Sequence, residues 1–121
     1  MLEIIVTEEF TLQYQRLSAS IQKKAEKQEK IFQSNPFHPS LHTEKLAPKG
    51  KQVWSFRIDK KYRIMFRFLS GRTVLFLTVG PHDWVYRIQF DHERQRIVQL
   101  MAQPQRAGEL LVRQGGAAVT V

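Results

Sequence analysis

The sequence predicts an α+β fold, in which an N-terminal strand and a two-helix hairpin pack on one face of a small, mainly antiparallel sheet. Two observations carry this prediction. Apolar residues recur at helical spacing over residues 8–33, and the segments between residues 53 and 79 alternate or run apolar as strands do. The length of 121 residues suits one domain with a single core.

The N-terminal third predicts a strand and then two helices. Residues 2–6 are β-branched and indicate the opening strand. Thr7 is placed to cap a helix over residues 8–17, with acidic residues in its first turn. A second helix is expected over residues 20–33, and Asn35-Pro36 ends it.

Three strands are expected after a loop. Residues 36–50 contain three prolines and a glycine, so they indicate the loop. Residues 53–59 and 62–69 alternate between large apolar and polar side chains, and residues 73–79 are apolar on both faces, as in a central strand. Gly80-Pro81 is expected to end that strand.

The alternation places several basic side chains on the sheet face opposite the helices. Ser55, Arg57, Arg63 and Arg67 share this face on neighbouring strands. Like charges that face each other across an antiparallel pair are destabilising. An anion between the arginines would relieve the repulsion, so this face predicts an anion-binding site.

The domain is expected to span residues 1–101, with a short helix over residues 93–101 near its end. Residues 102–121 contain Pro and Gly and predict a loosely ordered C-terminal tail. The chain has no cysteine, which excludes disulfides and thiolate metal sites and suits a reducing cytoplasm. No leader peptide and no bilayer-length apolar run is visible, so a soluble, cytoplasmic protein without a membrane partner is expected.

The positive charge is concentrated in one window. The formal net charge is +8, and residues 51–90 hold eight basic against two acidic side chains. Six aromatic residues lie in the same window, between Trp54 and Phe76. This distribution favours a polyanionic partner, with nucleic acid ahead of membrane. A well-solvated cationic surface is the alternative that composition alone leaves open.

Common catalytic and metal-binding motifs are absent. The sequence contains no GxGxxG, no P-loop and no HExxH. His38 and His42 lie four residues apart, but Pro39 between them prevents a helix, and no carboxylate cluster is near in sequence. Neither a metal site nor a small-molecule cofactor is therefore expected.

The remaining side chains suit metal-free RNA cleavage. In that reaction a ribose 2′-hydroxyl attacks the adjacent phosphorus. One group must take the hydroxyl proton, cations must stabilise the charge on the phosphate oxygens, and another group must protonate the leaving 5′-oxygen. Arginine, lysine, histidine and tyrosine supply these functions, and DNA is excluded because it lacks the 2′-hydroxyl.

Over most of residues 2–90 the chain resembles the RelE/ParE toxin superfamily. After a strand and a helical hairpin come "NPFHPSLHTEKL", "WSFRI", "KYRIMFRF" and "VLFLTVGPHDWVY", in the family's order and spacing. The resemblance implies a small α+β toxin of a type II toxin–antitoxin system. It implies cleavage of messenger RNA in the ribosomal A site without metal, and a cognate antitoxin as protein partner.

The resemblance also implies a site. Arg57 stands where RelE-like toxins often have lysine, and Arg63 matches the family's most recurrent arginine. His82 falls where members carry Arg or His, and Tyr86 matches a C-terminal tyrosine. These four are the expected catalytic residues. Ser55 departs from the pattern, because RelE-like members can have a second lysine there, and the general base is therefore left open.

Further residues are expected to bind RNA: Lys60, Lys61, Arg67 and Asp83. Asp83 follows His82 as in the His-Asp pairing of HigB-like members, and it could orient or charge the imidazole. The four expected catalytic residues also have a structural interpretation. Arg57 and Arg63 could be exposed strand residues, His82 a turn residue and Tyr86 a packed ring.

Two other functions remain open at this point. A ParE-like toxin has the same fold, lacks nuclease activity and inhibits a DNA topoisomerase, and an inactive RNA- or antitoxin-binding domain is the second alternative. His82 and Tyr86 favour the nuclease, because ParE-like members generally lack the catalytic set. Replacing Arg63 with alanine is expected to abolish toxicity while leaving the melting temperature nearly unchanged.

Overall fold

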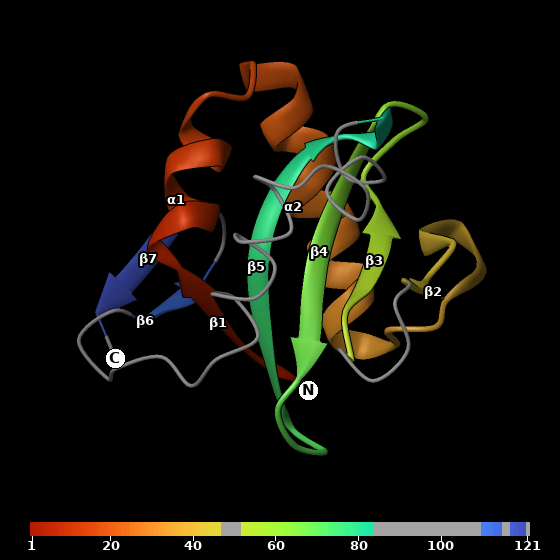
Figure 1. Cartoon of the computed structure of the whole chain (residues 1–121), viewed down its shortest axis with the longest axis vertical. Coiled ribbons are helices and arrows are strands. Elements are labelled where there is room, and N and C mark those ends of the chain that lie inside the picture. The colour runs from red at the N-terminus through yellow and green to blue at the C-terminus, as the bar shows by residue number, and fades with distance from the viewer. Residues whose placement is uncertain (47–51, 84–109, 115–116, 121) are drawn as a thin grey trace.

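Two helices lie on one face of a mixed sheet in the computed structural model, which describes residues 1–46, 52–83, 110–114 and 117–120 (Figure 1). The helices are α1 (Glu8–Gln15) and α2 (Ala19–Ser34), and a 3-10 turn, η1 (Pro39–Leu41), follows them. The sheet has seven strands in the order β2 (Glu44–Lys45), β3 (Trp54–Arg57), β4 (Tyr62–Phe68), β5 (Thr73–Pro81), β1 (Glu3–Thr7), β6 (Leu110–Gln114) and β7 (Ala117–Thr120). Among the strand pairs of the described residues, only β1–β5 is parallel. The predicted α+β class is confirmed.

Side-chain caps start both helices where the sequence predicts them. The Thr7 hydroxyl accepts the Phe10 N–H at 3.0 Å and donates to the Leu77 carbonyl at 2.7 Å, so one residue caps α1 and ties it to β5. The Ser18 hydroxyl accepts the Ile21 N–H at 3.3 Å at the start of α2. α1 begins at the predicted residue and ends two residues earlier than predicted, and α2 is one residue longer than predicted at each end.

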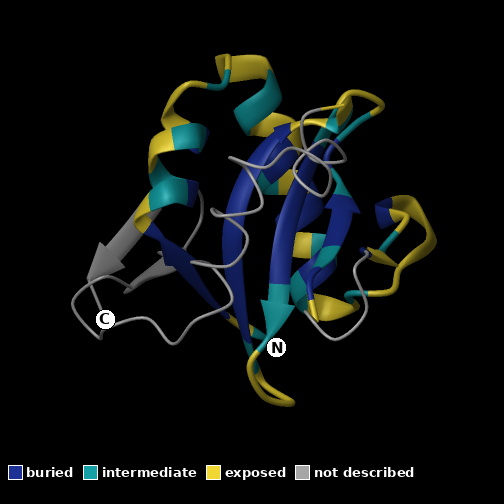
Figure 2. Ribbon diagram, viewed as in Figure 1, coloured by how far each residue is buried: buried dark blue, intermediate teal, exposed yellow. Residues whose placement is uncertain are grey.

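Phenylalanine rings fill the space between α2 and the sheet. Phe32 of α2 stacks on Phe56 of β3, with ring centroids 4.6 Å apart. The same ring meets Phe66 of β4 at 4.9 Å and Phe76 of β5 at 5.7 Å, both edge to face. All four rings are completely buried. Figure 2 shows the central strands as the most buried part of the molecule.

The structure departs from the sequence prediction in three places. The short strand β2 lies within the predicted loop, and β5 continues through Pro81, whose missing N–H does not prevent pairing at the strand end. A register shift between Met65 and Phe66 leaves Leu77 of β5 as an extra residue, so β5 is bulged.

The C-terminal region also differs in part from the expectation. Strands β6 and β7 lie in the range predicted as a loosely ordered tail, and β6 pairs with β1 through Ile5 and Val112. The helix expected over residues 93–101 lies outside the described residues. No helix in the described part of the chain has the length and apolar character that a bilayer crossing requires.

Replacing Phe32 with alanine should lower the free energy of unfolding by about 3–5 kcal/mol, because the change empties the space among three aromatic rings. Urea denaturation of the two proteins measures the difference. Leu12→Ala on the exposed side of α1 is the control and should change the free energy of unfolding by less than about 0.5 kcal/mol. Equal effects of both variants would contradict the assigned core.

Candidate functional site

The β3–β4 turn projects two lysines from one end of the sheet. Lys60 and Lys61 form its tip and are exposed. Asp59 organises the turn, because its Oδ1 accepts hydrogen bonds from the N–H groups of Lys61 (2.8 Å) and Tyr62 (2.9 Å). Aspartate commonly forms turns by accepting from the backbone two residues further on. The turn therefore holds two cations at a fixed place beside the start of β4.

The environment of Asp59 favours its charged form. Partial burial alone would raise the pKa of this carboxyl, but the backbone N–H groups of Lys61 and Tyr62 and the nearby ammonium of Lys24 outweigh it and lower the pKa below its usual value. Lys24 Nζ lies 3.5 Å from Asp59 Oδ2, so the same carboxylate also connects α2 to the turn.

Arg63 closes this turn from the sheet side. Its Nη1 donates hydrogen bonds to the carbonyl of Asp59 at 2.7 Å and to the carbonyl of Tyr62 at 3.1 Å. The residue is only 6% exposed. A buried guanidinium bonded to backbone carbonyls stabilises the local fold, so Arg63 is not the exposed strand residue that the sequence suggested.

The last residues of β5 lie against the same turn. Tyr62 pairs with Pro81 across the β4–β5 ladder. Immediately after β5, the N–H of His82 donates to the carbonyl of Lys61. The chain thus brings His82 next to the lysine tip, from a position about twenty residues further on.

Together these residues form an open hollow of about 410 Å³, called the basic hollow below. It is lined by Lys60, Lys61, Tyr62, Pro81, His82 and Asp83. The His82 side chain is 41% exposed, and its Nδ1 lies 3.6 Å from Asp83 Oδ1. That distance is too long for a hydrogen bond but places the carboxylate beside the imidazole ring.

A pair of arginines lies on the sheet next to the basic hollow. Arg57 of β3 and Arg63 of β4 are register partners, so they stand side by side on the same face. Arg57 is half-buried, and its Nε is buried without a hydrogen-bond partner in the part of the chain that the structure describes. The predicted sharing of one face by these two arginines is confirmed.

This end of the sheet is equipped to bind a phosphate and to exchange a proton. Two exposed ammonium groups can stabilise phosphate oxygens, and a half-exposed imidazole can donate or accept a proton. Among the described residues, no three His, Asp or Glu side chains gather closely enough to hold a metal ion.

Several solved structures have a similar fold. A YoeB/ParE toxin from Agrobacterium tumefaciens matches 67% of this chain and 99% of its own, with 22% identity and a TM-score of 0.57. The RelB-RelE antitoxin-toxin complex from Methanococcus jannaschii contains a chain that matches 71% of this one and 95% of its own, with 20% identity and a TM-score of 0.55. The DinJ-YafQ complex from E. coli contains a chain that matches 71% of this one and 99% of its own, with 14% identity and a TM-score of 0.52.

The chain has the RelE/ParE-type toxin fold. At these identities the likeness concerns the fold alone. No protein-family model matches the chain, and no curated protein matches it in sequence.

The predicted RNA-binding residues do not all lie at the basic hollow. Lys60, Lys61 and Asp83 line it. Arg67 follows Arg63 by four residues along β4, which places it roughly 13 Å away toward the other end of the strand. Tyr86 lies outside the described residues, so its role stays a prediction.

The sheet face opposite the helices is less open than the sequence suggested. Ser55 is 1% exposed, and Met65 and Thr78, which lie in the same row of the sheet, are also buried. The alternation of residues predicted which side chains share the face, but it carries no information on how deeply each one is buried.

Sequence reasoning assigned no functional role to Asp59 or Tyr62. Tyr62 packs partly against the core and also lines the basic hollow. The signal for Asp59 was available, because an aspartate before two lysines at the end of an alternating segment is typical of a turn.

Replacing Arg63 with alanine should lower the free energy of unfolding by about 1–3 kcal/mol, because the change removes hydrogen bonds to two backbone carbonyls. Thermal or urea denaturation measures it. The exposed tip variant Lys60→Ala is the control and should be nearly neutral. An unchanged stability of Arg63→Ala would restore the original expectation of an exposed, replaceable arginine.

Stability should fall in acid partly because of Asp59. Its pKa is lower in the folded protein than in the unfolded chain, so its contribution is complete above the unfolded value and is lost as pH falls through the folded value. Urea denaturation at neutral pH and near pH 3 should show Asp59→Asn clearly less stable than the parent at neutral pH, with a smaller difference in acid. A difference independent of pH would show that the carboxylate charge plays no part.

Proposed function

We propose that this protein is the toxin of a type II toxin–antitoxin system, a cytoplasmic endoribonuclease that cleaves messenger RNA on the ribosome without a metal ion. The observation that carries the proposal is the basic hollow, where His82 lies half-exposed beside Lys60 and Lys61. The toxin fold supports the same assignment.

The chemistry assigns a role to each side chain of the basic hollow. His82 exchanges the proton of the 2′-hydroxyl or of the leaving 5′-oxygen. Lys60 and Lys61 stabilise the negative charge that grows on the phosphate oxygens. Asp83, with Oδ1 3.6 Å from His82 Nδ1, orients the imidazole in the hollow.

The arginine pair supports the hollow from the sheet. Arg57 contributes positive charge at the edge of the site. Arg63 acts as a positioning residue, because its bonds to the carbonyls of Asp59 and Tyr62 fix the turn that carries the lysines. Direct contact of Arg63 with the phosphate stays a prediction, as does nucleotide binding by Tyr86.

An antitoxin is the proposed protein partner. Two of the solved structures with this fold are complexes, RelB with RelE and DinJ with YafQ. The net charge of +8 favours a partner segment that is acidic, because complementary charge accelerates association and selects partners.

One observation favours the ParE-like alternative. Arg63 is buried and bonded to backbone carbonyls, and Ser55 is buried where RelE-like members can have lysine. A toxin with so few open cations on the sheet could inhibit a topoisomerase, or bind RNA or an antitoxin, without cleaving RNA.

A single assay separates these functions. Translating messenger RNA is incubated with the purified protein, and cut sites are mapped by primer extension. Cuts in phase with the codons support the nuclease. Intact messenger RNA together with inhibited DNA supercoiling identifies the ParE-like function, and intact RNA with normal supercoiling identifies a binding domain.

His82→Gln should lower the cleavage rate by about 10²–10⁴-fold, because it removes a proton-exchanging group. Its melting temperature should stay unchanged, since the contact with Lys61 uses the backbone N–H of His82. His38→Gln, at a histidine outside the basic hollow, is the matched control and should cleave normally. A near-normal rate for His82→Gln would remove this histidine from the mechanism.

A further inference from the structure

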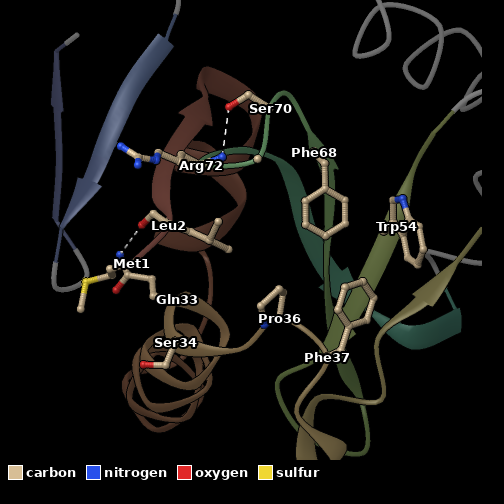
Figure 3. Close-up of a pocket in the computed structure, with 11 residues that line it drawn as sticks. Met1, Leu2, Gln33, Ser34, Pro36, Phe37, Trp54, Phe68, Ser70 and Arg72 are labelled. Carbon is tan, nitrogen blue, oxygen red and sulfur yellow. Dashed lines mark hydrogen bonds between the residues drawn. The ribbon is translucent and has the colours of Figure 1, made fainter.

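A second hollow, called the apolar groove below, lies at the other end of the central strands (Figure 3). It measures about 800 Å³ and runs between the start of β1, the end of α2 and the β4–β5 turn. The proposed reaction uses none of the residues that line it: Met1, Leu2, Gln33, Ser34, Pro36, Phe37, Trp54, Phe68, Ser70, Gly71 and Arg72.

Three aromatic rings form one wall of the apolar groove. The ring of Phe37 lies 5.8 Å from that of Trp54 and 6.0 Å from that of Phe68, and the latter two rings are 5.7 Å apart. Phe37 is nevertheless 57% exposed. Leu69, next to this wall in sequence, is also exposed. A cluster of exposed apolar side chains around a concave surface is typical of an interaction site.

The walls are fixed before any partner binds. The N–H of Phe37 donates to Asn35 Oδ1 at 3.0 Å, which holds the chain after α2 in a tight turn. On the opposite side, the N–H of Leu2 donates to the Gln33 carbonyl, and Gln33 Nε2 donates to the Leu2 carbonyl, each at 3.2 Å. Preformed walls reduce the ordering that a partner must impose on binding.

The charge at the apolar groove is positive. None of the described residues that line it is acidic, and Arg72 lies exposed in the β4–β5 turn. Lys45 Nζ lies 6.0 Å from the centre of the Trp54 ring at the aromatic wall. Two cations beside a mainly apolar surface suit a carboxylate next to hydrophobic side chains. A nucleic acid strand would need a cation for each of several phosphates.

We propose that the apolar groove binds a short peptide segment of a partner protein, whose large apolar side chains pack on Phe37, Trp54 and Phe68 while a flanking carboxylate pairs with Arg72. This is the usual pattern for peptide recognition in a groove, in which a few aromatic anchors supply most of the affinity. The inference does not depend on RNA cleavage, because the groove lies away from the basic hollow.

Selection from a phage-displayed library of short random peptides tests the proposal. Enriched peptides are synthesised with a fluorescent label and titrated against the full chain by fluorescence polarisation. The expected peptides combine at least two large apolar residues with Asp or Glu. Phe37→Ser should weaken their binding about tenfold or more, which is the size expected for loss of an anchor.

A charge variant and a matched control complete the design. Arg72→Glu, in an exposed turn, should weaken binding of the acidic peptides and improve binding of copies in which Lys replaces Asp or Glu. Leu12→Ser removes a similarly exposed apolar residue outside the groove and should leave binding unchanged. Melting curves test whether each variant is folded. If Phe37→Ser does not fold, Arg72→Glu alone tests whether the peptides bind in the apolar groove.

Several outcomes would overturn the proposal. These are the absence of enriched peptides, enrichment of basic peptides, or affinity that neither Phe37→Ser nor Arg72→Glu changes. Sedimentation of the chain alone could instead show a dimer that Phe37→Ser dissociates, which would assign the groove to a second copy. Binding of labelled RNA that Arg72→Glu abolishes would assign it to nucleic acid.

Discussion

The proposed site depends on the hydrogen bonds that the Asp59 carboxylate accepts in the β3–β4 turn. The carboxylate accepts two backbone N–H groups of this turn and lies 3.5 Å from the ammonium of Lys24. Arg63 bonds the carbonyls of the same turn from the sheet side. With the turn fixed from both sides, Lys60 and Lys61 stand at a defined place, and the carbonyl of Lys61 is available to hold His82.

The fold could be predicted from the sequence because apolar residues recur at helical spacing in the helices and alternate with polar residues in the strands. Alternation predicted that Arg57 and Arg63 share a face, and the β3–β4 register confirms it. The depth of burial did not follow, because it depends on tertiary packing: Ser55 and Arg63 were expected on an open surface and are buried. The link between His82 and Lys61 depends on where β5 ends, and the sequence suggested that Gly80-Pro81 would break that strand.

The two ends of the central strands have different chemistry. One end carries exposed ammonium groups and an imidazole around the basic hollow. The other carries three aromatic rings and Arg72 around the apolar groove. A charged substrate and an apolar partner segment could thus be bound at the same time, or one long partner could cover both. Strands β4 and β5 run from one end to the other.

The direct test of the central claim is the chemistry of the RNA ends, measured by mass spectrometry on messenger RNA cut by the purified protein during translation. Attack by the 2′-hydroxyl predicts a 2′,3′-cyclic phosphate at the new 3′ end, and no cut where the nucleotide before the scissile phosphate is 2′-deoxy. Equal cleavage at a 2′-deoxy nucleotide would contradict the account. The nucleophile would then have to be something other than the ribose 2′-hydroxyl, and the proposed mechanism contains no other nucleophile.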